Sequence, residues 1–357
     1  MTKSASPILT QIQNQITLSL LEQKPSSFNQ LFTSNRLPCS ISHACQTAKT
    51  EIHPGRTASL ERCQAAQKGG FLAIDFVIVK HTGLMIEGLS FNYASTQKRP
   101  ISSHAFVSSA IVYAKNRSGY APDPIPHRLE PHISQLLATL DYPHQTATQE
   151  MLSTAIQAKK DGIPFEAVLV DGEFTSKESL NGLAKEGIAI IGRYRTDVKV
   201  EFEGELLSVK ALAQRFPPGK ARYYAHFGCY VKRVKVLLPD VGEIALIFIW
   251  KRVSEGLDLC VLVSTFEGGI QTILAAWKAR WALEVCHRLY KQNFGLGQCQ
   301  AQSFATQLLH SSLVLRAFHE VCLVRRLEPF LTWKVAQAKT AEKFKNTFMT
   351  AYSRVEA

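Results

Sequence analysis

Short apolar runs separated by turn residues dominate the chain between Gly70 and about residue 115. FLAIDFVIVKH, LMIEGLSF and HAFVSSAIVYAK follow one another, with Thr82-Gly83 and a polar stretch around 95–100 between them. Runs of this length predict strands, and their order fits an antiparallel three-strand opening. The proline-rich residues 116–131 predict a loop or an extended connector, because proline has no backbone N–H donor and disfavours helix.

Helical and strand patterns then alternate. Residues 146–160 predict a helix and residues 165–170 a short buried strand. A Thr-x-x-Glu capping box at 175–178 predicts a helix that runs to about Lys185 and stops at Gly187, and IAIIG at 188–192 predicts the next strand. This order is the parallel crossover unit of an α/β sheet.

The pattern changes again beyond residue 195. Runs such as CYVKRVKVLL, EIALIFIW and DLCVLVS predict a β-rich insertion over 195–267. A long helix is predicted from about Ile270 to Asn293, and a final helix over about 303–325. We therefore expect five regions, which are a mostly helical or partly ordered N-terminal region 1–69, a core in two parts (70–194 and 268–330), the insertion 195–267 and a C-terminal tail 331–357. Within the N-terminal region, short helices are expected near 8–21 and 57–67.

Composition narrows the class of partner. The 357 residues carry a net charge of +12 and 46% hydrophobic residues, with a pI near 9.3. Such an excess of positive charge attracts polyanions, so nucleic acid is the favoured partner. We find no apolar stretch of membrane-spanning length and no export signal, and we expect a cytoplasmic, nucleoid-associated protein without membrane attachment. The eight cysteines and the histidines show no metal-binding spacing, so no zinc site is expected and the thiols should be reduced.

Candidate chemistry gathers on the helix predicted over 270–293. Trp277, Glu284 and Lys291 recur every seven residues, and Arg280 lies one turn before Glu284. At 3.6 residues per turn these positions share one side of the helix, so a carboxylate is framed by cations.

Two aspartates stand where strands are predicted, Asp75 within FLAIDFVIV and Asp171 at the end of the apolar run in EAVLVDGEF. An ionised carboxylate in an apolar strand needs a cation, because desolvating an unpaired charge costs at least several kcal/mol. With Glu284 they suggest a metal site for phosphodiester chemistry, since Mg²⁺ prefers carboxylate oxygens. Each acid also has a structural alternative. These are a salt bridge of Asp75 with Lys80, His81 or a remote arginine, a turn or helix cap at Asp171, and a helical pair of Glu284 with Arg280 or Arg288.

The order and spacing of these blocks resemble the DDE-type transposases of bacterial insertion sequences, in the branch with a tyrosine-arginine-glutamate-lysine signature. The resemblance covers roughly residues 71–325, with Trp277 in place of the tyrosine and Gly172 where an arginine is frequent. It implies an α/β fold built on a ribonuclease-H-like mixed sheet flanked by helices, with a β-rich insertion before the glutamate helix. It also implies that Asp75, Asp171 and Glu284 are catalytic and hold two Mg²⁺ (or Mn²⁺) ions, with Asp75 bridging both.

Several further residues are candidates for DNA contact. Arg280 and Lys291 can bind phosphate, or they can form a solvated helix face. Trp277 can stack on an unpaired base or belong to the core. The other basic candidates, near and within the predicted insertion, are Arg193, Arg195, Lys232, Arg233 and Lys235.

The resemblance implies a transposase that cuts DNA at terminal inverted repeats and joins the freed 3′-hydroxyl ends to target DNA, as a homodimer in a synaptic complex. The N-terminal region 1–69 is the candidate for binding the element ends. Two alternatives stay open. One is a catalytically inactive or domesticated DNA-binding protein, and the other is a metal-dependent DNA nuclease without strand transfer.

Overall fold

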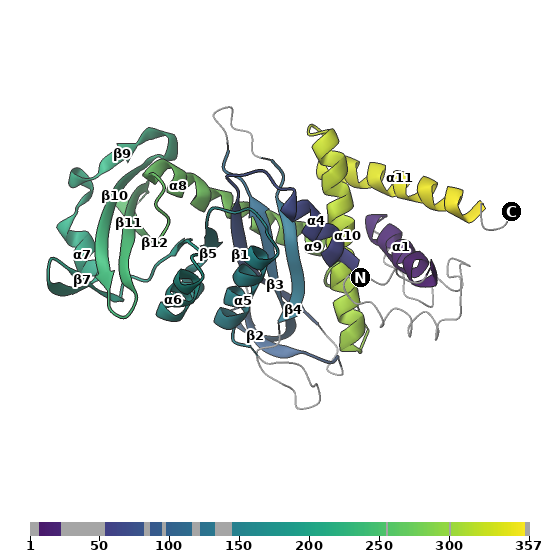
Figure 1. Cartoon of the computed structure of the whole chain (residues 1–357), viewed down its shortest axis with the longest axis horizontal. Coiled ribbons are helices and arrows are strands. Elements are labelled where there is room, and N and C mark those ends of the chain that lie inside the picture. Colours follow the sequence, from purple (N-terminus) through teal and green to yellow (C-terminus); the bar gives the residue numbers. More distant parts are fainter. Residues whose placement is uncertain are drawn as a thin grey trace.

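The structure is a computed structural model that describes residues 7–22, 54–81, 86–94, 98–115, 122–132, 145–254, 256–299 and 301–353. Its described part is a mixed α/β fold, in which one long sheet of parallel and antiparallel strands is flanked by helices (Figure 1). The strand order is β2-β3-β1-β5-β6-β12-β11-β10-β7-β8, with β4 on β3 and β9 on β10. None of the described helices combines the length and the apolar character needed to cross a bilayer.

The sheet begins with the predicted antiparallel strands, which are β1 (Phe71–Lys80), β2 (Ser90–Ala94) and β3 (Arg99–Val112). The whole length of β1 pairs with residues 103–112 of β3, and β2 pairs with the start of β3. The prediction of a loop or connector for the proline-rich segment is wrong for its second half. Ile125–His132 forms strand β4, which pairs with β3. Among the described strands β4 pairs only with β3, and prolines are tolerated in such an edge strand because its outward positions need no N–H donor.

The predicted crossover unit is present. It consists of β5 (Val168–Val170), the short 3₁₀ turn η1 (Gly172–Phe174), α6 (Lys177–Lys185) and β6 (Ile190–Arg193), and the predicted helix before it is α5 (Ala147–Lys160). β5 runs parallel to both β1 and β6. The predicted capping box is wrong, since Ser176 rather than Thr175 caps α6. The Thr175 hydroxyl instead contacts the carbonyl oxygens of Gly172 at 3.0 Å and Arg193 at 2.7 Å, which ties η1 to β6.

Residues 195–267 are β-rich, as predicted. They form β7 (Lys199–Phe202), β8 (Glu205–Ser208), α7 (Val209–Arg215), η2 (Pro218–Lys220), β9 (Arg222–Tyr224), η3 (Ala225–Phe227), β10 (Cys229–Leu238), β11 (Gly242–Val253) and β12 (Gly256–Ser264). β12 pairs antiparallel with β6, with Leu262 opposite Arg193. These strands therefore extend the central sheet rather than form a separate one (Figure 1).

The remaining described helices pack either on the sheet or on one another. They are α1 (Pro7–Leu21), α4 (Pro54–Gln64), α8 (Ile270–Ala279), α9 (Trp281–Gln292), α10 (Phe304–Leu327) and α11 (Trp333–Ser353). The helix predicted over 270–293 is divided at Arg280, which keeps helical angles (φ −50°, ψ −34°). Residues 331–357 were expected as a tail, but most of them form α11, whose Trp333 stacks on Phe318 of α10 at 5.1 Å. α1, α4, α10 and α11 lie at the opposite end of the molecule from β7–β12 (Figure 1).

The sheet separates two apolar cores. Ala73, Val77 and Val79 of β1 belong to the core that also contains Leu283 and Tyr290 of α9. Leu72 and Ile74 belong to the other core, together with side chains of α5 and α6. Because side chains alternate along a strand, Asp75 follows Ala73 to the face covered by α9.

Candidate functional site

Asp75 lies in the middle of β1, between β3 and β5. One of its oxygens, Oδ1, accepts a hydrogen bond of 2.8 Å from the backbone N–H of Phe76, and its side chain is 15% exposed. Burial raises the pKa of Asp75 to about 7, and the nearby Glu284 carboxylate also raises it, while the Phe76 N–H and Arg280 lower it. A buried acid with a raised pKa at the centre of a strand marks a candidate functional site.

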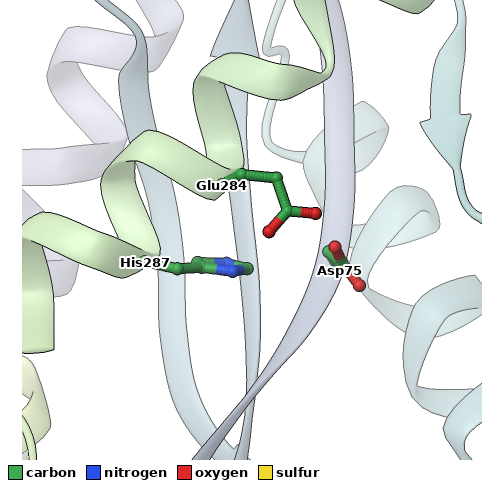
Figure 2. A group of neighbouring side chains, drawn as sticks. All are labelled: Asp75, Glu284 and His287. Carbon is green, nitrogen blue, oxygen red and sulfur yellow. The ribbon is translucent and has the colours of Figure 1, made fainter. Parts of the chain in front are cut away.

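Glu284 comes to Asp75 from α9. Leu283, Cys286 and Tyr290 of this helix are fully buried in the core under the sheet, which fixes α9 against β1. Glu284 lies on the side that faces the strand, and its carboxylate points toward Asp75 (Figure 2). The structure thus brings together two of the three predicted acids, from positions far apart in the sequence.

Arg280 contacts both of these acids. Its Nη1 lies 3.2 Å from Asp75 Oδ2 and 3.5 Å from Glu284 Oε1, and its side chain is only 11% exposed. Its guanidinium also lies over the Trp277 ring, 5.1 Å from the centroid. The predicted phosphate-binding arginine is therefore the counter-ion of the acid pair in this structure. The salt bridges expected as structural alternatives for Asp75 and Glu284 are both present.

His287 is a member of the site that sequence reasoning missed. It follows Glu284 by three residues, so it lies on the same face of α9. Asp75, Glu284 and His287 each place a ligand atom within 4.8 Å of the other two (Figure 2). The His287 side chain is buried, and burial lowers its pKa to about 3, with further lowering by Lys291 and Arg280. The signal available in the sequence was the Glu-x-x-His spacing.

Asp171 directly follows β5, the strand that pairs with the Asp75 strand β1. The parallel register pairs Ala73 with Leu169, and two residues further along each strand come Asp75 and Asp171. Asp171 keeps an extended backbone (φ −81°, ψ 175°), so the alternation of β5 turns its side chain to the α9 face. Asp171 Oδ1 accepts a 2.8 Å hydrogen bond from Gly172 N, which caps η1 as the structural alternative expected. Asp171 does not belong to the group formed by Asp75, Glu284 and His287.

The other residues predicted to contact DNA differ in position. Arg193 is exposed and follows Gly192, the partner of Val170, so it lies beside Asp171 on the same face of the sheet. Lys291 is exposed near the end of α9. Trp277 is half-buried and packs against the core under α9, whereas its neighbour Trp281 is 60% exposed. Of these two tryptophans, Trp281 is the one with a ring open to solvent.

The basic candidates of residues 195–267 do not form one surface. Arg195 pairs with Asp197 and Lys235 with Glu243, all at exposed positions. Arg233 is a structural residue, because its guanidinium donates to the carbonyl oxygen of Gly268 at 3.0 Å. Lys232 lies over the Phe216 ring, 5.4 Å from the centroid. Strand alternation along β10 turns Lys232 and Arg233 to opposite faces.

The sequence matches no known protein-family model, and no curated protein is significantly similar to it. The site therefore has to be judged on its own chemistry. Two carboxylates and an imidazole are a donor set that divalent cations accept. The unpaired buried nitrogen of His287 fits the same use, because Nε2 has no hydrogen-bond partner.

Cysteines take no part in this site. Of the six described cysteines, Cys63, Cys229 and Cys286 are buried, the other three are half-buried, and all are free thiols. Within the described part of the chain no cysteine belongs to a possible metal group. Cys39 and Cys45 lie outside the described residues.

Proposed function

We propose that this protein is a transposase that cuts DNA at element ends and joins 3′-hydroxyl ends to target DNA by metal-dependent phosphoryl transfer. One observation carries the proposal. Asp75 of β1 and Glu284 of α9 meet at one point under the sheet, and Asp171 follows the neighbouring strand at the same level and on the same face. These are the acids that the resemblance to DDE-type transposases implies.

The architecture supports the proposal. The first acid lies on a strand flanked by an antiparallel and a parallel neighbour, the second follows that parallel neighbour, and the third lies on a helix beneath them. A mixed sheet flanked by helices is compatible with a ribonuclease-H-like fold, and the β-rich segment stands before the glutamate helix as expected.

In this proposal each residue has a defined task. Asp75 and Glu284 hold a divalent cation, and Asp171 helps to hold a second one. When bound, such ions stabilise charge on the attacking and departing oxygens of the phosphodiester. Arg193 and Lys291 contact DNA phosphates beside the acids, and Arg280 keeps the two closest carboxylates together.

The test is cleavage of labelled fragments of the genomic DNA that flanks the coding region, in Mg²⁺ or Mn²⁺, with a shuffled fragment as the DNA control. Asp75→Asn, Asp171→Asn and Glu284→Gln should each abolish cleavage and joining, whereas Asp258→Asn, at an exposed site on β12, should not. If a variant cleaves as well as the wild-type protein, its residue does not belong to the site. Cleavage without joined products would instead favour the nuclease.

One observation favours the inactive DNA-binding protein as a second candidate. Arg280 already neutralises the acid pair, so the cluster has a counter-charge without a metal. DNA binding that weakens steeply with salt, combined with no nicking in either ion, would support this reading.

A further inference from the structure

His287 lies beside the acid pair in a state that packing alone does not explain. Its side chain is nine-tenths buried, at 7% exposure, and Nε2 has no hydrogen-bond partner. A buried polar atom without a partner is costly and calls for an explanation, and a role in binding an ion is one. The ring points into the space between α9 and β1, where the carboxylates of Asp75 and Glu284 also point (Figure 2).

Other buried histidines of the chain show the contrast. Both ring nitrogens of His104 have partners, His81 Nε2 at 3.1 Å and the carbonyl oxygen of Glu87 at 2.9 Å. His319 also has an unpartnered Nε2, but it lies in α10 beside a cavity lined by Arg62. Within the described residues, only His287 has an unpartnered nitrogen and also belongs to a group with two acids whose ligand atoms lie within 4.8 Å of one another.

We propose that His287 is a metal ligand together with Asp75 and Glu284, and that this mixed nitrogen and oxygen site prefers Mn²⁺ to Mg²⁺. The proposal rests on the proposed function in one respect, since it names the ion of the same site. The ligand assignment itself concerns metal binding and does not require DNA cleavage.

The donor set explains the preference. Mg²⁺ is a hard ion that favours oxygen ligands in near-ideal octahedral geometry and gives up its waters reluctantly. An imidazole nitrogen suits first-row transition-metal ions better, and each oxygen replaced by nitrogen shifts the balance further from Mg²⁺. A site made only of Asp75, Asp171 and Glu284 would lack this bias.

Arg280 does not exclude an ion from this position. It contacts Asp75 through Oδ2 and Glu284 through Oε1. Each carboxylate therefore keeps a second oxygen, of which Asp75 Oδ1 accepts the Phe76 N–H, and a carboxylate oxygen has more than one lone pair. An ion bound through these oxygens and the His287 ring leaves the guanidinium in place.

The decisive measurement is pulsed electron paramagnetic resonance of Mn²⁺ bound to the full chain without DNA. A directly bound imidazole nitrogen modulates the Mn²⁺ signal, and the modulation changes when the protein carries isotope-labelled histidine. We expect this modulation in the wild-type protein and in His319→Gln, which removes a buried histidine with the same unpartnered nitrogen. We expect its loss in His287→Gln. If His287→Gln fails to fold, the isotope-labelled wild-type protein decides the point, because its signal must report a bound histidine.

Calorimetric titration with Mn²⁺ and Mg²⁺ tests the preference. The ratio of the Mn²⁺ to the Mg²⁺ association constant should fall at least about tenfold in His287→Gln, the lower end of the effect of altering a metal site's surroundings. An unchanged ratio, or wild-type Mn²⁺ without nitrogen modulation, would overturn the proposal. Nitrogen-bound Mn²⁺ in a protein that never cleaves DNA would support His287 as a metal ligand and contradict the proposed transposase function. Cleavage that depends on the three acids but not on His287 would support the transposase function and contradict His287 as a metal ligand.

Discussion

Asp75 illustrates that the residues of the candidate site lower the stability of the fold. Its carboxylate is largely buried and lies beside a second carboxylate, with one arginine to neutralise both. Burial raises its pKa to about 7, so near neutral pH the pair tends to retain a proton in the absence of metal. Folded and unfolded chains thus bind protons differently, and stability must depend on pH.

The first prediction concerns Asp75→Asn in a buffer with a chelator. A folded-state pKa raised from 3.8 to about 7 means that the contribution to stability is full below pH 3.8 and is lost as the pH rises toward 7. Asparagine does not titrate, so this loss should disappear. From urea unfolding, the stability of the variant relative to the wild-type protein should rise between pH 5 and pH 7 by on the order of 2 kcal/mol. Asp258→Asn, at an exposed position, should give a curve parallel to the wild-type one, and a parallel curve for Asp75→Asn would contradict the raised pKa.

A second prediction concerns Arg280→Gln. Without the guanidinium, Asp75 and Glu284 are left close together without a cation, and breaking a buried ion pair in this way costs about 3 kcal/mol. A divalent ion should replace the lost charge, so Mn²⁺ should raise the melting temperature of the variant more than that of the wild-type protein. Arg288→Gln removes a charge from an exposed position of the same helix and is the control. Equal shifts with Mn²⁺ in all three proteins would show that the ion does not replace the charge of the guanidinium.

At the same scale, the sequence predicts which acids meet better than it predicts what surrounds them. Asp75 and Glu284 meet as expected, because a charge in an apolar strand and one on an amphipathic helix both need a partner. His287 was overlooked although it follows Glu284 at helical spacing, because a lone histidine among apolar residues is usually part of a core. Only the packing of α9 against β1 shows that its nitrogen faces two carboxylates.

Among the elements, β5 and β6 carry the second acid, and Gly192 sets how closely they approach. A Cβ at Gly192 would lie 2.4 Å from Thr175 Cγ2 and 3.2 Å from the carbonyl oxygen of Val170. Thr175 cannot simply rotate away, because its hydroxyl contacts the carbonyl oxygen of Arg193. The residue after Val170 is Asp171, so any shift of β5 moves the acid.

We therefore predict that Gly192→Ala lowers the free energy of unfolding by about 1–3 kcal/mol, the usual range for overpacking a well-packed site. Gly219→Ala is the matched control, since a Cβ at that glycine meets nothing within 4 Å. Urea unfolding followed by circular dichroism measures both. A Gly192→Ala protein as stable as the control would show that β5 and β6 separate freely, and Asp171 would then have no fixed position beside Asp75.

Most elements could be predicted from the sequence, whereas one strand and several partners and faces could not. FLAIDFVIVK is apolar on both sides because β1 is covered on both faces, so the pattern does not reveal which face Asp75 takes. Ile125–His132 looked like a connector because its prolines disfavour strands, and only its place at an edge makes them acceptable. Thr175 matched a capping box, but its hydroxyl serves β6 instead.

For the whole molecule, a net charge of +12 indicates an anionic partner without saying where it binds. The basic candidates differ in whether their charges are already engaged within the protein. Lys235 is paired with Glu243 at the surface, and Arg233 is committed to the backbone of residues 266–268. Arg193 is exposed and lies next to the acid that follows β5. If DNA lies across the acids, Arg193 is placed to contact a phosphate, whereas we expect no phosphate contact from Lys235.

The salt dependence of DNA binding tests this placement. The slope of the logarithm of the binding constant against the logarithm of the salt concentration is about −0.9 for each phosphate neutralised on duplex DNA. Arg193→Gln should therefore reduce the magnitude of the slope by about 0.9 and weaken binding to all duplex sequences alike. Lys235→Gln removes the same charge and should change the slope much less, because that lysine is already engaged by a carboxylate. Fluorescence anisotropy with a labelled duplex measures both slopes. Equal changes would mean that DNA responds only to the total charge, and a reversed order would place the duplex on β10 and β11, away from the acids.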